Sequence, residues 1–110
     1  VTTPQDLALL DVKKGADMFK KVNAPILGVV ENMSFFLCPN CNVESKIFQG
    51  KGGKFESNRL DVPLLGEIFI SSELASSTDL GDPYVLKYMD SPITQIYSSI
   101  ASKIVERVNK

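Results

Sequence analysis

Two short apolar stretches decide the fold: Ile26–Asn32, with the sequence ILGVVEN, and Pro63–Ile70, with the sequence PLLGEIFI. Each is shorter than an ordinary helix and almost continuously apolar, which is typical of strands buried on both faces of a parallel sheet. Helical patterns lie before, between and after the two stretches. This alternation predicts an α/β fold in which helices cover a parallel sheet.

A helix is predicted to begin close to the N-terminus. Thr3 is a candidate cap, Pro4 suits the first helical position, and Asp6 falls where the helix dipole favours a negative charge. The helical pattern ends at the Asn-Ala-Pro sequence of residues 23–25. Residues 1–3 have the pattern of the end of a strand, so we expect the chain to be a piece of a longer protein.

The second half of the chain is predicted to end in a long helix. Ser91 and Pro92 provide a cap and a first-position proline in the right order, and apolar residues then recur at helical spacing as far as Val108. Shorter helices are expected at residues 55–60 and 72–77, and loops at residues 50–53 and 79–83. No repeat or linker divides the sequence, so residues 1–110 are expected to belong to a single domain.

The composition excludes several classes of function. The chain has 110 residues, 44% of them hydrophobic, with 12 Lys and Arg against 13 Asp and Glu and a net charge of −1. No basic excess favours nucleic acid as a partner, and no apolar run approaches the roughly 20 residues of a membrane-spanning helix. Because the sequence has no histidine, it offers no Ser-His-Asp or Cys-His catalytic group and no Cys/His zinc site.

Cys38 and Cys41 are the most specific chemical feature of the sequence. Two thiolates separated by two residues can bind one metal centre, and Pro39 stiffens the loop between them. A structural zinc ion or a four-iron cluster normally takes four ligands, whereas this chain offers two thiols. A closed site of four cysteines would therefore need a second copy of the chain. A redox-active pair, a zinc-bridged dimer and two inert buried thiols are the alternatives.

Two further segments are candidates for nucleotide binding, and only the first of them fits. Asn32 ends a predicted strand, where α/β sheets place ligand-contacting groups, and its amide suits a purine edge. A turn-forming role is the alternative for this residue. The glycine-rich segment Gly50–Lys54 does not fit a phosphate-binding Walker A loop, because Phe48 and Phe55 stand where the motif needs Gly and Ser or Thr. We expect that segment to be a turn.

Taken together, the ordered segments resemble the Mrp/ApbC-type P-loop ATPases that carry iron–sulfur clusters, a family that includes mitochondrial nucleotide-binding-protein-like proteins. The resemblance lies chiefly in two motifs, ENMS at residues 31–34 and FLCPNC at residues 36–41. Further matching segments, in family order, are residues 1–12, 28–30, 47–48, 52–53, 63–68 and 79–83. Together they span nearly the whole chain.

The resemblance implies that residues 1–110 are the C-terminal half of a P-loop NTPase domain of the MinD/ParA kind, with the Walker A half absent. It implies a homodimer in which Cys38 and Cys41 of two protomers hold a bridging [4Fe–4S] cluster that is passed to apo iron–sulfur proteins. It also implies that Asn32 lies beside the adenine base of ATP, which the full-length protein would bind with Mg²⁺. The expected function is an ATP-dependent iron–sulfur cluster scaffold or carrier, and this fragment is not expected to hydrolyse ATP alone.

Three residues depart from the family pattern. Phe69 stands where proline is usual, close to the segment expected near the base, and Gln49 and Asn42 replace usual glycines. Because asparagine tolerates the left-handed backbone conformation, the change at Asn42 is mild. Both cysteines of the motif are intact.

Two other functions remain as alternatives: a non-enzymatic, zinc-bridged α/β interaction module and a MinD/ParA-like positioning ATPase. The positioning ATPase has no reason to carry the cysteine motif, and the mixed charges on the last helix do not suit membrane binding. Two cysteines without a disulfide framework favour a reducing compartment. We expect this compartment to be the cytoplasm or, alternatively, the mitochondrial matrix.

Overall fold

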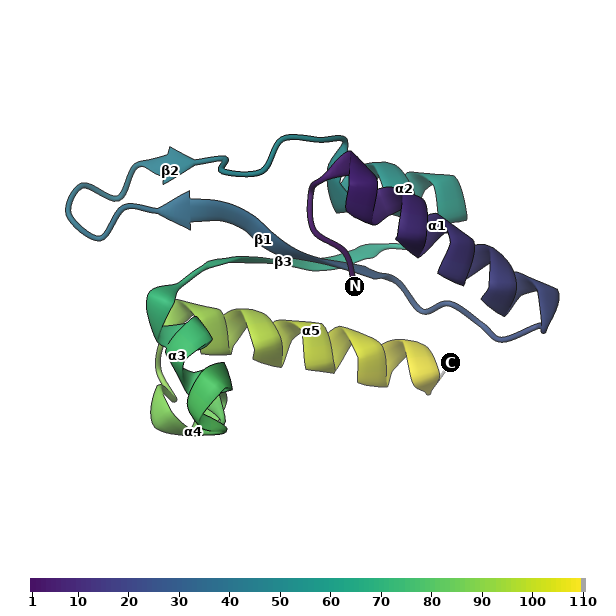
Figure 1. Ribbon diagram of the computed structural model, residues 1–110. Coiled ribbons are helices and arrows are strands. Elements are labelled where there is room, and N and C mark those ends of the chain that lie inside the picture. The colour runs from purple at the N-terminus through teal and green to yellow at the C-terminus, as the bar shows by residue number, and fades with distance from the viewer. Residues whose placement is uncertain (110) are drawn as a thin grey trace.

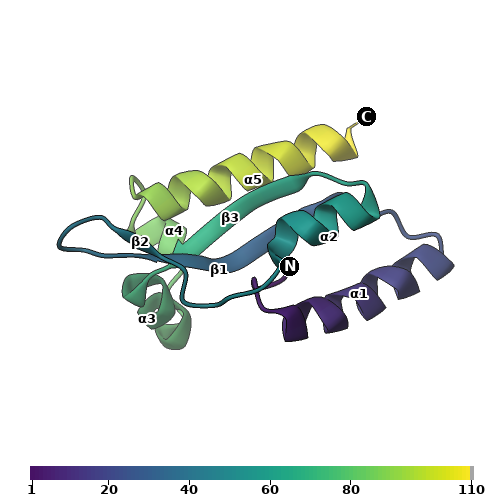
Figure 2. The ribbon, with the colours of Figure 1, turned by 90° about the horizontal axis from the view of Figure 1, so that it is seen from above.

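A computed structural model describes residues 1–109 and contains a three-stranded sheet with helices on both faces (Figures 1 and 2). The elements are α1 (Asp6–Lys21), β1 (Val29–Leu37), β2 (Glu44–Ser45), α2 (Gly52–Leu60), β3 (Leu64–Ile70), α3 (Ser72–Leu80), α4 (Tyr84–Lys87) and α5 (Pro92–Val108). Helix α5 lies along one face of the sheet, and α1 and α2 lie on the other side (Figure 1). The predicted α/β fold is confirmed.

The two strands predicted from the sequence pair in parallel as expected, and a short third strand makes the sheet mixed. β1 and β3 run parallel, and Thr2 forms an isolated parallel bridge to Glu31 on the other edge of β1. β2, however, is antiparallel to Phe36 and Leu37 at the end of β1. The apolar pattern misses this strand because β2 is short, polar and exposed, and it forms only because the chain turns back after β1.

Strand β1 begins at Val29 and continues past Asn32 to Leu37, which shifts the predicted strand toward the C-terminus. Its regular ladder with β3 ends where Asn32 faces Ile68, and the next pair is Phe36 with Ile70. Residues 33–35 of β1 therefore face a single residue of β3. Bulges of this kind bend a strand and change its direction.

The core lies between the sheet and α5. Its buried cluster consists of Leu65, Ile68, Tyr84, Ile93 and Ile100. Gly66 lets the helix approach closely, since a Cβ atom there would lie 2.6 Å from Cγ1 of Ile100. A smaller cluster, made by Ala16, Val29 and Leu60, joins β1 to α1 and α2. Helix α5 thus supplies two residues of the main core, Ile93 and Ile100.

The two long helices begin differently. Ser91 caps α5 as predicted, because its Oγ accepts the N–H of Thr94. The cap predicted for α1 is wrong: Gln5 occupies the N-cap position, and no side chain caps the helix. Thr2 is hydrogen-bonded to β1, so the backbone is still extended at Gln5, and the hydroxyl of Thr3 donates to the Gln5 side chain instead.

The shorter helices are longer or more numerous than predicted. Helix α2 begins at Gly52, inside the glycine-rich segment that was expected to be a turn. Helix α3 continues to Leu80, through residues expected to form a loop. Helix α4 at Tyr84–Lys87 has no counterpart in the prediction. These differences change the lengths of the loops, but the predicted arrangement of helices covering a sheet is kept.

The end of β1, the loop after it and β2 project from the rest of the molecule. We call residues 33–45 the cysteine arm, and its loop forms one end of the molecule in both views (Figures 1 and 2). The molecule measures 45 × 32 × 23 Å and has a radius of gyration of 15.0 Å. A compact domain of this size has about 13 Å. The projecting arm contributes to this extended shape.

Candidate metal and nucleotide sites

Both predicted metal ligands lie at the tip of the cysteine arm. Cys38 directly follows β1, and Cys41 lies in the loop that leads to β2. Two backbone hydrogen bonds close this loop: the N–H of Cys38 donates to the carbonyl of Val43 at 3.0 Å, and the N–H of Asn42 donates to the carbonyl of Cys38 at 2.9 Å. Cys38 is partly exposed and Cys41 exposed, so the alternative of two buried thiols is wrong.

The loop favours the thiolate form of Cys38. The backbone N–H of Asn40 donates to its sulfur, and the N–H and the thiol of Cys41 do the same, which lowers the pKa of Cys38 below the ordinary value of 9.0. The thiolate is the form that binds metals. Within residues 1–109, no cluster of three or more Cys, Asp or Glu side chains is arranged to hold a metal. Each chain thus offers two sulfurs to the predicted four-ligand site.

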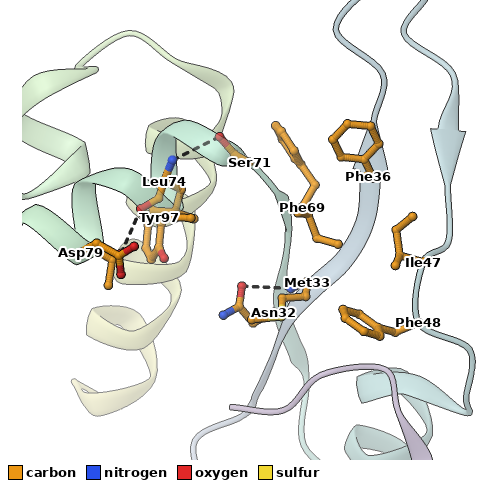
Figure 3. A pocket seen from close by; sticks show the side chains of 13 residues that line it. Asn32, Met33, Phe36, Ile47, Phe48, Phe69, Ser71, Leu74, Asp79 and Tyr97 are labelled. Atoms are coloured by element: carbon orange, nitrogen blue, oxygen red, sulfur yellow. Dashed lines mark hydrogen bonds between the residues drawn. The ribbon is translucent and has the colours of Figure 1, made fainter.

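A second candidate site is a cavity of about 780 Å³ beside the bulge in β1 (Figure 3). Its lining is mostly apolar and comes from the sheet, the segment before α2, and helices α3 and α5. Phe69 and Tyr97 contribute aromatic rings, and Asn32 and Asp79 contribute polar groups. A volume of this size is typical of sites for small ligands and cofactors.

Asn32 lies in this cavity, although not at a strand end as predicted. It lies inside β1, at the last residue of the regular ladder with β3. Its Oδ1 accepts the N–H of Met33 at 2.9 Å, which fixes the orientation of the amide. The nitrogen of the amide then points into the cavity, toward the side where Asp79 and Tyr97 lie (Figure 3). The site thus presents a hydrogen-bond donor to a ligand.

The structure does not bring Asn32 and the cysteines together. The cavity lining contains neither Cys38 nor Cys41. The two sites are instead joined by a single strand, because β1 runs from Asn32 to the residue before Cys38. A ligand at one site and a metal at the other would be connected through this strand.

Sequence reasoning missed the role of Glu31. Its carboxylate is buried and accepts the N–H of Gly53 at 2.8 Å. A Cβ atom on Gly52, whose φ is +78°, would lie 2.6 Å from the same oxygen. The available signal was an acidic residue at the end of an otherwise apolar stretch, followed at a distance by paired glycines. Its partner could not be named from that signal.

Comparison with protein-family models shows to which family the chain belongs. A family model described as "ParA: NUBPL iron-transfer P-loop NTPase" matches residues 1–105. The chain belongs to this family. The family fits the resemblance noted in the sequence, and it confirms a P-loop NTPase type of fold. The position of this NUBPL-type chain within the complete domain stays a prediction.

Named relatives agree with this assignment. The "Iron-sulfur cluster transfer protein NUBPL" of Dictyostelium discoideum is 42% identical, over 98% of this chain and 33% of that protein. The "Iron-sulfur cluster carrier protein" of Aquifex aeolicus is 46% identical, over 96% of this chain and 30% of that protein. The NUBPL-type chain thus spans about a third of the length of these curated relatives.

A solved structure supports the fold. The nucleotide-binding protein of Archaeoglobus fulgidus, in complex with ADP and with Co, matches with a TM-score of 0.63 and 35% identity. The match covers 76% of the NUBPL-type chain and 35% of the archaeal chain. Among residues 1–109, no helix has both the length and the apolar character needed to cross a membrane.

Proposed function

We propose that this NUBPL-type chain is part of an ATP-dependent carrier of iron–sulfur clusters. Cys38 and Cys41 of two chains would supply the four thiolates of a bridging [4Fe–4S] cluster, which is the cargo delivered to apo iron–sulfur proteins. The observation that carries the proposal is the pair of accessible thiols at the tip of a projecting arm, with no third ligand beside them in residues 1–109. A half-site of this kind is completed by two-fold symmetry.

The cavity beside Asn32 is proposed to take the adenine base of ATP. An adenine ring offers acceptor nitrogens to the donor of Asn32, and the apolar lining suits its flat faces. The relative from Archaeoglobus fulgidus binds ADP, which supports this choice of ligand. Since residues 1–110 contain no Walker A motif, binding of the phosphates with Mg²⁺ and hydrolysis of ATP are proposed for the full-length protein alone.

The cluster assignment is tested by anaerobic reconstitution with iron and sulfide. The protein is expected to develop the broad visible absorbance of an iron–sulfur cluster, with about four irons per two chains. Cys38→Ser and Cys41→Ser should each abolish this absorbance, because each removes two of the four thiolates of the dimer. Ser45→Ala, an exposed change on the same arm, is the control and should leave it unchanged. Persistence of the absorbance in both cysteine variants would falsify the assignment.

Metal analysis separates the carrier from a zinc-bridged interaction module. Protein isolated without oxygen is expected to contain iron and sulfide in equal amounts. Stoichiometric zinc without iron would instead favour the module. We place the carrier in a reducing compartment, the cytoplasm or the mitochondrial matrix, since oxidation of the two thiols would remove the metal ligands.

A further inference from the structure

Glu31 is a buried residue next to Asn32 in β1, but it does not line the cavity and it is not part of the cysteine loop. It is 8% exposed and is the third residue of β1. Its Oε1 accepts the N–H of Gly53 in the first turn of α2, and its Oε2 lies 2.5 Å from Oγ of Ser34. A buried carboxylate is unfavourable unless its oxygens are hydrogen-bonded. These two contacts therefore hold the side chain in one position.

The Ser34 hydroxyl also connects the two ends of the bulge in β1. The hydroxyl of Ser34 lies 3.3 Å from the main-chain oxygen of Glu31 as well as close to its carboxylate. Between them, Met33 has a left-handed φ of 57°, a conformation that is unfavourable for methionine and persists where the surroundings impose it. The side chain of Asn32 also stabilises this conformation, because its Oδ1 accepts the N–H of Met33.

The bulge also lies where the cysteine arm begins. Beyond it, β1 returns to β3 only at the pair of Phe36 with Ile70, and Cys38 follows two residues later. A change of backbone direction at residues 32–34 would alter how the arm begins, and the pair of Phe36 with Ile70 is its remaining contact with β3 before Cys38. Gly52 shows how close α2 comes to this point, since any side chain there would collide with the Glu31 carboxylate.

We propose that Glu31 and Ser34 are positioning residues, which set the direction of the cysteine arm relative to the cavity at Asn32. Glu31 connects the bulge to the start of α2 through the N–H of Gly53, and Ser34 connects the two ends of the bulge through its hydroxyl. Neither residue lines the cavity at Asn32 or belongs to the loop that holds the cysteines. The inference rests on the proposed function, because it assigns the arm the task of presenting the two thiols to a second chain.

The test measures the position of the arm directly. In the Cys41→Ser background, a spin label on Cys38 and a second label on Gln95→Cys, an exposed position of α5, report one distance distribution by pulsed electron resonance. Ser34→Ala is expected to broaden or shift this distribution. Ser57→Ala is the matched control: Ser57 is 1% exposed and its Oγ donates to the carbonyl of Lys54 within α2. It should leave the distribution unchanged even if it lowers stability equally.

Conservative replacement adds a second criterion. Glu31→Gln keeps an oxygen for Gly53 and a polar group for Ser34, so the distribution should stay close to that of the parent protein. Glu31→Ala should broaden it. In the protein with both cysteines, Ser34→Ala should load the cluster but lose it to a chelator several-fold faster than Ser57→Ala.

The outcomes separate this inference from the proposed function. If Ser34→Ala and Ser57→Ala give the same distances and the same rate of cluster loss, the positioning role is wrong while the carrier function stands. If the parent protein binds no cluster, the carrier function fails. The distance measurement still decides whether Glu31 and Ser34 orient the arm.

Discussion

At the residue scale, the environment of Cys38 comes from the backbone of its own loop. The N–H groups of Asn40 and Cys41 donate to its sulfur, together with the thiol of Cys41, and they lower its pKa. Because two of these donors are main-chain groups, the effect depends on the loop being folded. Deprotonation is required before a thiol binds a metal, so the closed loop would favour the proposed role of Cys38 as a ligand.

We expect Cys38 to react as a thiolate at lower pH than an ordinary thiol. A lowered pKa means more thiolate at any given pH below it. In the Cys41→Ser variant, where a hydroxyl replaces the thiol donor, the rate of alkylation by iodoacetamide should reach half its maximum below pH 9.0. Unfolding in urea removes the loop and should move the midpoint upward. A midpoint that urea does not change would contradict the prediction.

At the element scale, the sequence predicts those features that depend on neighbouring residues. Ser91 and Pro92 specify the start of α5 within a few positions of the chain, and the spacing of Cys38 and Cys41 is visible without any structure. The start of α1 was predicted incorrectly because Thr2 is hydrogen-bonded to β1, which is distant in the sequence. The role of Glu31 could not be predicted for the same reason, since its partner Gly53 lies 22 residues away.

The two helix starts can be compared by matched substitutions. Ser91→Ala removes the side chain that accepts the N–H of Thr94, and it should lower the free energy of unfolding by about 1 kcal/mol. Thr3→Ala removes an exposed hydroxyl that caps nothing, and its effect should stay within about 0.5 kcal/mol. Urea denaturation measures both. Equal losses from the two changes would mean that Thr3 does cap α1 in solution.

At the scale of the whole molecule, the arm separates the thiols from the packed body. The tip of the arm forms one end of a molecule whose longest dimension is 45 Å. In the proposed dimer, the two chains would meet through their tips. The body of each chain, including the cavity at Asn32, then remains accessible while the cluster is bound.

Assembly should therefore follow cluster loading. We expect the mass in solution, measured by light scattering after anaerobic size-exclusion chromatography, to double when the [4Fe–4S] cluster is reconstituted. Removal of iron with a chelator should lower the mass again to its value before reconstitution. The Cys38→Ser variant should show no increase in mass. A dimer of unchanged stability in the Cys38→Ser variant would show that other surfaces hold the chains together.

The exposure of the arm also bears on how a cluster would leave it. A cluster held between two narrow tips is bordered by solvent on its remaining sides, since Cys41 is exposed and Cys38 partly so. The thiols of an acceptor could then bind iron before the donor thiols dissociate. Transfer would proceed by associative ligand exchange, in which the iron passes through an intermediate shared by carrier and acceptor and is never released into water.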